Sequence, residues 1–223
     1  TEVTAKILKK PQVVKAALIG FPTIEEGANA TSEIISNGII PAGMEIMDKA
    51  LIEATDNFSK AGYPRDAELL LIVEVDGTES EVDILLKDVS SICKKNNCSS
   101  LKLSQSEKER LSFWSGRKSA FPVCGAMAPD YYCMDGVIPR GKLAEALLEI
   151  RRLSEKYNLP VANCFHAGDG NLHPLIMYDG ADKEQFRKTE EFGAEILKAC
   201  VRLGGVITGE HGVGVEKREL MCE

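Results

Sequence analysis

Apolar residues follow two patterns along the chain, and these patterns predict alternating strands and helices. Continuous apolar runs, such as Leu-Leu-Leu-Ile-Val at positions 69–73, are typical of strands buried inside a sheet. Stretches with an apolar residue at every third or fourth position are typical of amphipathic helices. The predicted strands are residues 13–20, 68–75, 100–103, 134–138, 161–166 and 172–178. The predicted helices are residues 23–36, 48–60, 78–92, 104–114, 143–157 and 182–203.

Two of the predicted helices begin with a capping box. Thr23 is followed three positions later by Glu26, and Thr78 by Glu81. In this motif the threonine hydroxyl accepts the N–H of the third helical residue, and the glutamate side chain returns to the cap. We therefore expect helices to start directly after Thr23 and Thr78.

The order of the elements predicts the fold class. Strand–helix pairs alternate, and Asp169-Gly170 between two apolar runs is a strong signal for a two-residue hairpin turn. Hairpins mixed with crossover helices indicate an α+β fold, with a mainly antiparallel sheet covered by helices on one side. Two ferredoxin-like halves fit this order, although the sequence contains no convincing internal repeat. Residues 68–75 are too continuously apolar for a surface strand and are expected at the centre of the sheet.

The composition argues against several classes of function. The net charge is −7 and no basic stripe is present, which argues against a nucleic-acid partner. No apolar run approaches the ~20 residues of a membrane span, and the first residues carry no signal-peptide pattern. The seven cysteines include no Cys-x-x-Cys pair, so we expect reduced thiols and a cytoplasmic protein, with peripheral membrane association left open. Cys93, Cys164 and Cys200 are expected to serve mainly in packing.

All three histidines lie in glycine-rich motifs near the C-terminal end. His166 and His173 bracket Ala-Gly-Asp-Gly-Asn-Leu, and His211 lies in Gly-Glu-His-Gly-Val-Gly at 209–214. A two-residue turn at 169–170 predicts that His166 faces His173, with Cβ atoms roughly 5 Å apart. Two imidazoles at that separation can share one divalent ion, with Glu210 as the third ligand and His211 left as a base.

Simpler interpretations remain open at this point. The histidines of a polar hairpin and a flexible glycine loop can also bond only to backbone groups. Arg117, beside Lys118, is either a solvated cation near the C-terminal end of a helix or a guanidinium that holds a substrate carboxylate. The ligand set does not discriminate strongly between zinc, manganese and iron.

These motifs resemble the C-terminal domain of FAD-linked oxidases of the vanillyl-alcohol-oxidase type. The resemblance rests on residues 166–174 and 209–217, and extends to residues 41–48, 114–118 and 135–140. It is strongest to the flavin subunit of glycolate oxidase, with D-lactate and D-2-hydroxyglutarate dehydrogenases as relatives. It implies that residues 1–223 form a substrate or cap domain, inactive by itself. An N-terminal domain that binds FAD and a tail beyond Lys217 are expected to lie outside the chain.

The resemblance also implies roles for individual residues. His166, His173 and Glu210 match metal ligands of the 2-hydroxyglutarate relatives. His211 matches the residue beside the substrate hydroxyl, and Arg117 matches an arginine that grips the carboxylate. We expect the backbone at Gly209, Gly212 and Gly214 to approach substrate and cofactor closely.

The reaction expected from the resemblance is oxidation of a small 2-hydroxy acid, with metal assistance and hydride transfer to FAD. Phe121, Cys133 and Leu175 stand where the 2-hydroxyglutarate relatives carry Thr, Lys and Asn, which favours glycolate or lactate over a dicarboxylate. An iron–sulfur partner subunit is a further expectation. The alternatives are a metal-dependent hydrolase domain and a non-catalytic, metal-stabilised interaction domain.

Overall fold

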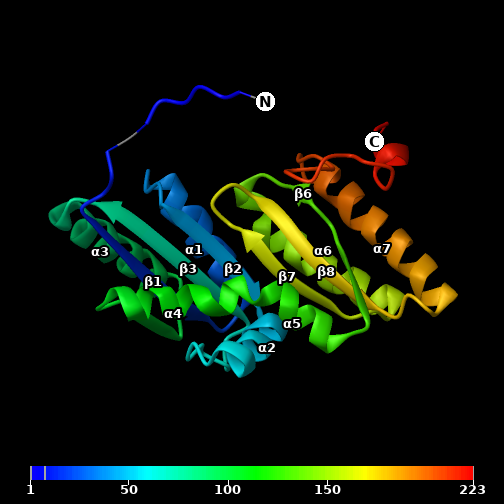
Figure 1. The fold of residues 1–223 in the computed structure, drawn as a ribbon, viewed down its shortest axis with the longest axis horizontal. Coiled ribbons are helices and arrows are strands. Elements are labelled where there is room, and N and C mark those ends of the chain that lie inside the picture. The colour runs from blue at the N-terminus through cyan, green and yellow to red at the C-terminus, as the bar shows by residue number, and fades with distance from the viewer. Residues whose placement is uncertain (1, 8, 223) are drawn as a thin grey trace.

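The computed structural model describes residues 2–7 and 9–222, which form one sheet with helices on both faces (Figure 1). The strands are β1 (Val13–Phe21), β2 (Gly43–Asp48), β3 (Leu69–Gly77), β4 (Ser100–Leu103), β5 (Asp130–Cys133), β6 (Gly136–Val137), β7 (Val161–His166) and β8 (Asn171–Tyr178). The α-helices are α1 (Ile24–Ser36), α2 (Lys49–Ser59), α3 (Glu79–Lys95), α4 (Glu107–Lys118), α5 (Ala120–Met127), α6 (Leu143–Tyr157) and α7 (Lys183–Arg202). Two short 3-10 helices are η1 (Arg140–Lys142) and η2 (Arg218–Leu220).

The predicted helix starts at both threonines are confirmed. Thr78 and Glu81 form the full capping box, in which the threonine hydroxyl accepts the N–H of Glu81 and the glutamate accepts the N–H of Thr78. The Thr23 hydroxyl accepts the N–H of Glu26 at 3.2 Å and donates to its carboxylate at 2.8 Å. Local sequence alone is enough to begin α1 and α3.

The sheet consists of two ferredoxin-like halves, as the order of elements predicts. Its strand order is β4-β1-β3-β2-β7-β8-β5, with β6 beside β8, and every pairing is antiparallel. The first half runs β1-α1-β2-β3-α3-β4, with α2 inserted after β2. In the second half the place of the last strand, after α7, is taken by a single bridge between Val137 and Val206. The two halves meet where β2 pairs with β7.

Helices cover both faces of the sheet, so the prediction of a single covered face is wrong. Helices α1, α3, α6 and α7 cover one face, while α2, α4 and α5 pack on the other, where α4 and α5 cross in front of the strands in Figure 1. Strand β3 explains the need for both layers. Leu69 and Leu71 enter one core and Leu70 and Ile72 the other, and all four are almost fully buried. The central position predicted for this strand is confirmed, because β3 lies between β1 and β2.

Two predicted elements differ from the observed ones. Residues 134–138 do not form one strand, because β5 ends at Cys133 and β6 begins at Gly136; the buried carboxylate of Asp135 lies between them. The helix predicted at 104–114 begins after the cap Ser106 and continues to Lys118, and α5 follows directly. Pro122 does not interrupt α5, because it lies in the first turn, where no helical N–H is needed.

The buried cysteines behave as core residues. Cys93 and Cys200 are almost wholly buried in the core beneath α1, α3, α6 and α7, and Cys164 is buried in the opposite core. Membrane crossing would require a long, continuously apolar helix, and none occurs in residues 2–7 and 9–222.

Candidate functional site

The hairpin of β7 and β8 brings two histidines together, but in a different register from the predicted one. His166 pairs with Asn171 and His173 pairs with Cys164, so direct opposition of the two histidines is wrong by two residues. A shift of two positions keeps side chains on the same face of a strand. The two imidazole rings therefore still meet, with centroids 5.0 Å apart and planes at 90°.

The register differs because the turn has four residues, 167–170, rather than two. The carbonyl of His166 accepts the N–H groups of Asp169 at 3.3 Å and Gly170 at 3.1 Å, and the Asp169 carboxylate accepts the N–H of Asn171 at 3.0 Å. Gly170 has φ +84°, and a Cβ there would lie 2.2 Å from the carbonyl oxygen of Ile138. Only glycine fits this position.

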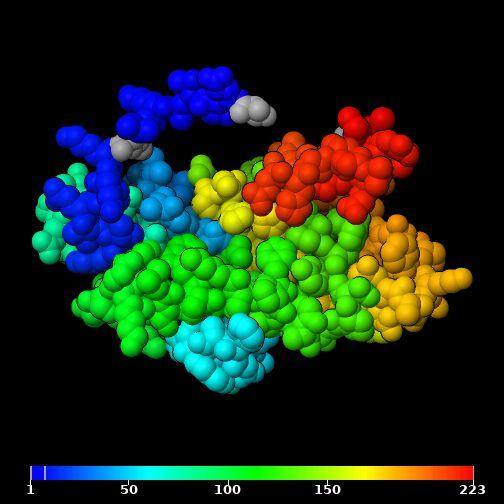
Figure 2. Space-filling view, in the orientation of Figure 1, coloured from blue at the N-terminus to red at the C-terminus, as the bar shows by residue number. Residues whose placement is uncertain are grey.

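A buried aspartate holds the loop that carries Glu210 and His211. The Asp135 carboxylate accepts the backbone N–H groups of Gly209 at 3.0 Å, Glu210 at 3.1 Å and His211 at 3.0 Å. It also accepts the Thr208 hydroxyl at 2.8 Å. Figure 2 shows the segment after α7, in red, lying beside the yellow hairpin turn. Asp135 therefore places this loop against β8.

The electrostatics of Asp135 follow from these contacts. Burial alone would raise its pKa, but the N–H groups of His211 and Glu210 and the Thr208 hydroxyl outweigh burial and hold the pKa well below its usual range. Asp135 lies in the stretch 135–140, and no role for it was predicted from the sequence. A single acidic residue inside a strand-like apolar run was the signal that could have found it.

Glu210 lies among the three histidines. Its Oε1 atom is 3.1 Å from Nε2 of His173, 3.7 Å from Nε2 of His166 and 3.9 Å from Nε2 of His211. Possible ligand atoms of His166, His173 and Glu210 all lie within 4.8 Å of one another. The His211 ring stacks on His173 at 5.3 Å. The structure thus brings the three predicted ligands and the predicted base into one group.

The chemistry of these donors fits a divalent cation. Two imidazoles and one carboxylate form a common three-ligand set for zinc, manganese or iron. His173 is 2% exposed, and burial followed by the proximity of His166 lowers its pKa, which favours the neutral ring that binds metals. Its Nδ1 atom is buried and has no hydrogen-bond partner among the described residues.

Glu45 bridges the histidine group and Arg117. Glu45 pairs directly with His166 across the seam between β2 and β7. One carboxylate oxygen lies 2.7 Å from Nδ1 of His166, and the other accepts Nε–H of Arg117 at 2.9 Å. The bond to Glu45 raises the pKa of His166. No role for Glu45 was predicted from the sequence, because its partners come from distant parts of the chain.

The last turn of α4 positions Arg117. Its backbone N–H donates to the hydroxyl of Tyr63 at 3.0 Å. The neighbouring Gly116 allows this contact, because a Cβ there would lie 2.4 Å from ring atoms of Tyr63. Among the described residues, no side chain or backbone group is bonded to the Nη atoms of Arg117. They are therefore free to bind a carboxylate.

The three glycines of the last motif differ in their surroundings. A Cβ at Gly209 would lie 1.6 Å from Nδ2 of Asn171, so this glycine is required for packing against β8. Gly212 and Gly214 have φ +85° and +56° with open space around them, so they serve a left-handed backbone on an exposed loop.

Apolar groups extend from the histidines along the same face of the sheet. Leu175 follows His173 by two positions on β8, is fully buried and pairs with Cys133 of β5. Phe121 of α5 packs against the same core. Phe121, Cys133 and Leu175 thus border one apolar surface.

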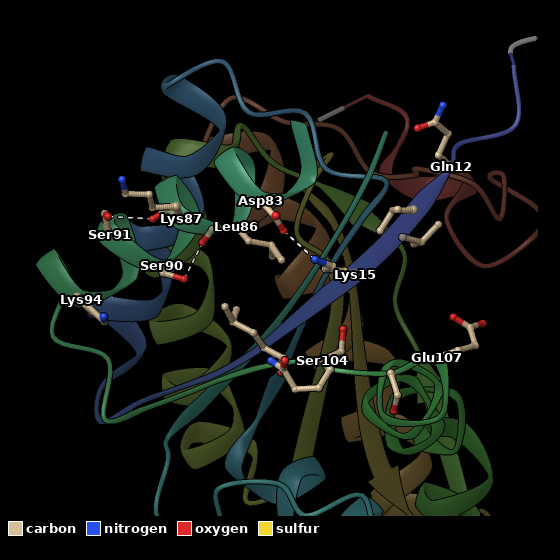
Figure 3. A pocket seen from close by; sticks show the side chains of 15 residues that line it. Gln12, Lys15, Asp83, Leu86, Lys87, Ser90, Ser91, Lys94, Ser104 and Glu107 are labelled. Carbon is tan, nitrogen blue, oxygen red and sulfur yellow. Dashed lines mark hydrogen bonds and ion pairs between the residues drawn. The ribbon is translucent and has the colours of Figure 1, made fainter. Parts of the chain in front are cut away.

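Two cavities differ sharply in their chemistry. One, of about 590 Å³, borders the site and is lined by residues 40–44 together with Glu45, Arg140, His166, Gly168 and Asp169. The larger, of about 880 Å³, lies in the other half between α3, the start of β1 and the segment after β4 (Figure 3). Its lining includes an exposed ion pair between Lys15 and Asp83 at 2.7 Å, together with Lys87, Lys94 and Glu107. Of these two cavities, the first adjoins the histidine group through Glu45 and His166.

Comparison with known proteins assigns the fold and the family. The family model described as "FAD linked oxidases, C-terminal domain" matches residues 10–223. The chain is 50% identical to the glycolate oxidase subunit GlcD of Escherichia coli (strain K12), over all of this chain and 44% of that protein. It is 34% identical to GlcD of Bacillus subtilis (strain 168), over 97% of this chain and 46% of that protein. It is 30% identical to the mitochondrial D-lactate dehydrogenase [cytochrome] of Arabidopsis thaliana, over 99% of this chain and 39% of that protein.

Solved structures share the fold at low identity. A 4-ethylphenol oxidase from Gulosibacter chungangensis matches with TM-score 0.64 and 13% identity, over 91% of this chain and 46% of that one. p-Cresol methylhydroxylase matches with TM-score 0.65 and 15% identity, over 90% of this chain and 46% of that one. The chain spans less than half the length of the curated relatives above. By its sequence and its fold, the chain belongs to the family of FAD-linked oxidases, as their C-terminal domain.

Proposed function

We propose that the chain is the substrate domain of a flavin-dependent oxidase or dehydrogenase that oxidises a small 2-hydroxy acid, glycolate or D-lactate. The observation that carries this proposal is the grouping of His166, His173 and Glu210, with His211 stacked on His173 and Arg117 joined to the group through Glu45. The 50% identity to a glycolate oxidase subunit supports the same reaction class.

His166, His173 and Glu210 would hold a divalent ion, zinc, manganese or iron. Such an ion would act there as a Lewis acid that makes the substrate hydroxyl more acidic. His173 contributes a buried ring and Glu210 a more exposed carboxylate, so one side of the site stays open to solvent and substrate. This metal assistance is part of the proposal.

Arg117 binds the substrate carboxylate through its two Nη groups, since its Nε is engaged by Glu45. His211 takes the proton of the α-hydroxyl at its ring nitrogen. Its side chain is 45% exposed and stacks on His173, so it lies at the open side of the group. The apolar surface of Leu175, Cys133 and Phe121 offers no partner for a second carboxylate, which favours a small monocarboxylate.

FAD would be bound mainly by a domain outside this chain and would supply the acceptor for the hydride of the α-carbon. The loop with Gly209, Gly212 and Gly214 is proposed to face that cofactor, because two of these glycines leave the backbone uncovered. A multi-subunit assembly with an iron–sulfur partner is proposed by analogy with relatives that are named as subunits. The free cysteines fit a cytoplasmic setting, with contact to a membrane surface as an extension of the proposal.

The test uses the full-length protein under anaerobic conditions. Flavin bleaching is followed after addition of glycolate, D-lactate and D-2-hydroxyglutarate. We expect rapid bleaching with one of the two monocarboxylates and slow bleaching with the dicarboxylate. A flavin that none of these acids reduces would refute the proposal.

A further inference from the structure

We propose that Glu45 is a positioning residue that couples the two working parts of the site. Through one oxygen it sets the metal-binding nitrogen of His166, and through the other it sets the guanidinium of Arg117 for the substrate. This inference rests on the function proposed above and assigns a role to a residue that touches neither ion nor substrate.

The backbone makes the placement of Glu45 precise. Strands β2 and β7 pair so that Glu45 lies directly opposite His166, at the seam between the two halves of the sheet. The Glu45 side chain is 12% exposed and that of Arg117 is 10% exposed. Such a carboxylate is costly to bury unless both of its oxygens are bonded, and here both are.

The contact with Glu45 determines which nitrogen of His166 is free. An ionised carboxylate only accepts hydrogen bonds, so Nδ1 of His166 must carry the proton that it donates at 2.7 Å. The lone pair is then on Nε2, the nitrogen that lies 3.7 Å from Glu210 and would be the one to bind an ion. A carboxylate behind a histidine ligand fixes the ring and its tautomer in many metal sites.

The contact with Glu45 also orients Arg117 toward the carboxylate of the substrate. Glu45 accepts only Nε–H, so the flat face of the guanidinium is held while both Nη groups stay free. Glu45 therefore holds the guanidinium of Arg117 and the ring of His166 in a fixed relation to each other. A substrate that is held by its carboxylate and its hydroxyl needs this relation to be constant.

Glutamine at position 45 is a sharp test because it is nearly isosteric and cannot serve both partners. If its carbonyl faces His166, its NH₂ group meets Nε–H of Arg117, and two donors oppose each other. If its NH₂ faces His166, Nδ1 must accept and the proton moves to Nε2, which blocks metal binding.

The experiment compares Glu45→Gln with Glu74→Gln in the full-length protein. Glu74 is the matched control: it is also part-buried, and it accepts hydrogen bonds from Arg110 at 2.5 Å and Trp114 at 2.6 Å, but contacts no histidine. Each protein is stripped with a chelator and titrated with Mn²⁺ and Zn²⁺ against a competing chelator. Flavin content and thermal midpoint are measured in parallel.

We expect Glu45→Gln to weaken metal binding 10–100-fold, while Glu74→Gln stays within about twofold of wild type. Saturating metal should restore kcat in Glu45→Gln and leave KM raised, because the metal deficit is filled but Arg117 remains misaligned. If Glu45→Gln caused only a general packing defect, added Mn²⁺ or Zn²⁺ would not restore kcat, and the flavin content would fall.

Metal affinity within twofold of wild type in Glu45→Gln overturns the inference. So does a wild-type protein that binds neither ion, since Glu45 then has no ligand to orient. The proposed oxidation of 2-hydroxy acids is judged separately, by whether substrate bleaches the flavin. The two ideas can therefore fail independently.

Discussion

The ammonium nitrogen of Lys217 lies 3.1 Å from the Oδ2 atom of Asp135, and both side chains are almost wholly buried. The same nitrogen donates to the backbone carbonyl of Asp135 at 2.8 Å. Since Asp135 also holds the N–H groups of residues 209–211, this pair joins three separate segments of the chain. The loop that carries Glu210 and His211 is thus anchored from behind by a buried ion pair.

Asp135→Asn is expected to lower the free energy of unfolding by about 3–5 kcal/mol, because the charge of Lys217 is left buried without its partner. Urea denaturation of the full-length protein measures the change. Asp83→Asn removes an exposed pair with Lys15 and should cost less than about 1 kcal/mol. Equal losses in the two variants would contradict the anchoring role.

The effect of Asp135 also has a defined pH dependence. The pKa of Asp135 is lower in the folded protein than in the unfolded chain, so its contribution to the free energy of unfolding is fully present above about pH 4. The contribution is lost as pH falls through the lowered pKa. The stability gap between wild type and Asp135→Asn should therefore be constant near neutrality and shrink only in strong acid.

Gly209→Ala is expected to displace the loop, because its Cβ would lie 1.6 Å from Nδ2 of Asn171 and 2.9 Å from Asp135. We expect a loss of about 1–3 kcal/mol in stability and weaker metal binding, as Glu210 moves with the backbone. Gly141→Ala is the control, since nothing lies within 4 Å of a Cβ at that position. Unchanged metal affinity in Gly209→Ala would show that Glu210 does not depend on this contact.

His211→Ala should reduce turnover 10²–10⁴-fold with flavin and metal still bound, as expected for loss of a general base. His173→Ala should instead lose the metal itself, because His173 is the buried member of the group. Elemental analysis and steady-state kinetics of the full-length protein separate the two effects. Turnover close to wild type in His211→Ala would remove this residue from the base role.

Asp48 gives a second pH effect, of opposite sign. It caps α2 by accepting the N–H of Leu51, and burial raises its pKa to about 6. The folded protein therefore binds more protons than the unfolded chain between about pH 4 and 6, and stability falls as pH rises through this window, by about 3 kcal/mol. Asp48→Asn does not titrate and can still cap α2 through its amide oxygen, but it loses an acceptor for the two hydrogen bonds that Asn163 donates to Asp48. The comparison is therefore of the slope of stability against pH, which urea denaturation between these pH values should show to be flatter in the variant. Identical slopes of stability against pH in wild type and Asp48→Asn would show that Asp48 does not cause the loss of stability in this pH window.

Local patterns in the sequence were sufficient for much of this protein. The capping boxes at Thr23 and Thr78, the apolar run that became β3, and the shared face of His166 and His173 all follow from spacing along a few residues. Helix and strand periods, caps and turns depend on residues that are close in sequence, so they can be predicted without knowing which strands pair.

The tertiary structure decided what lies beside these local elements. Glu45 meets His166 across 121 positions, and Asp135 holds residues 209–211 across more than 70. The four-residue turn shifted the hairpin register, and a second helical layer covered the face that was expected to be open. Such contacts depend on which strands pair and which faces need covering. That choice is made by burial over the whole sheet, and no short stretch of sequence contains it.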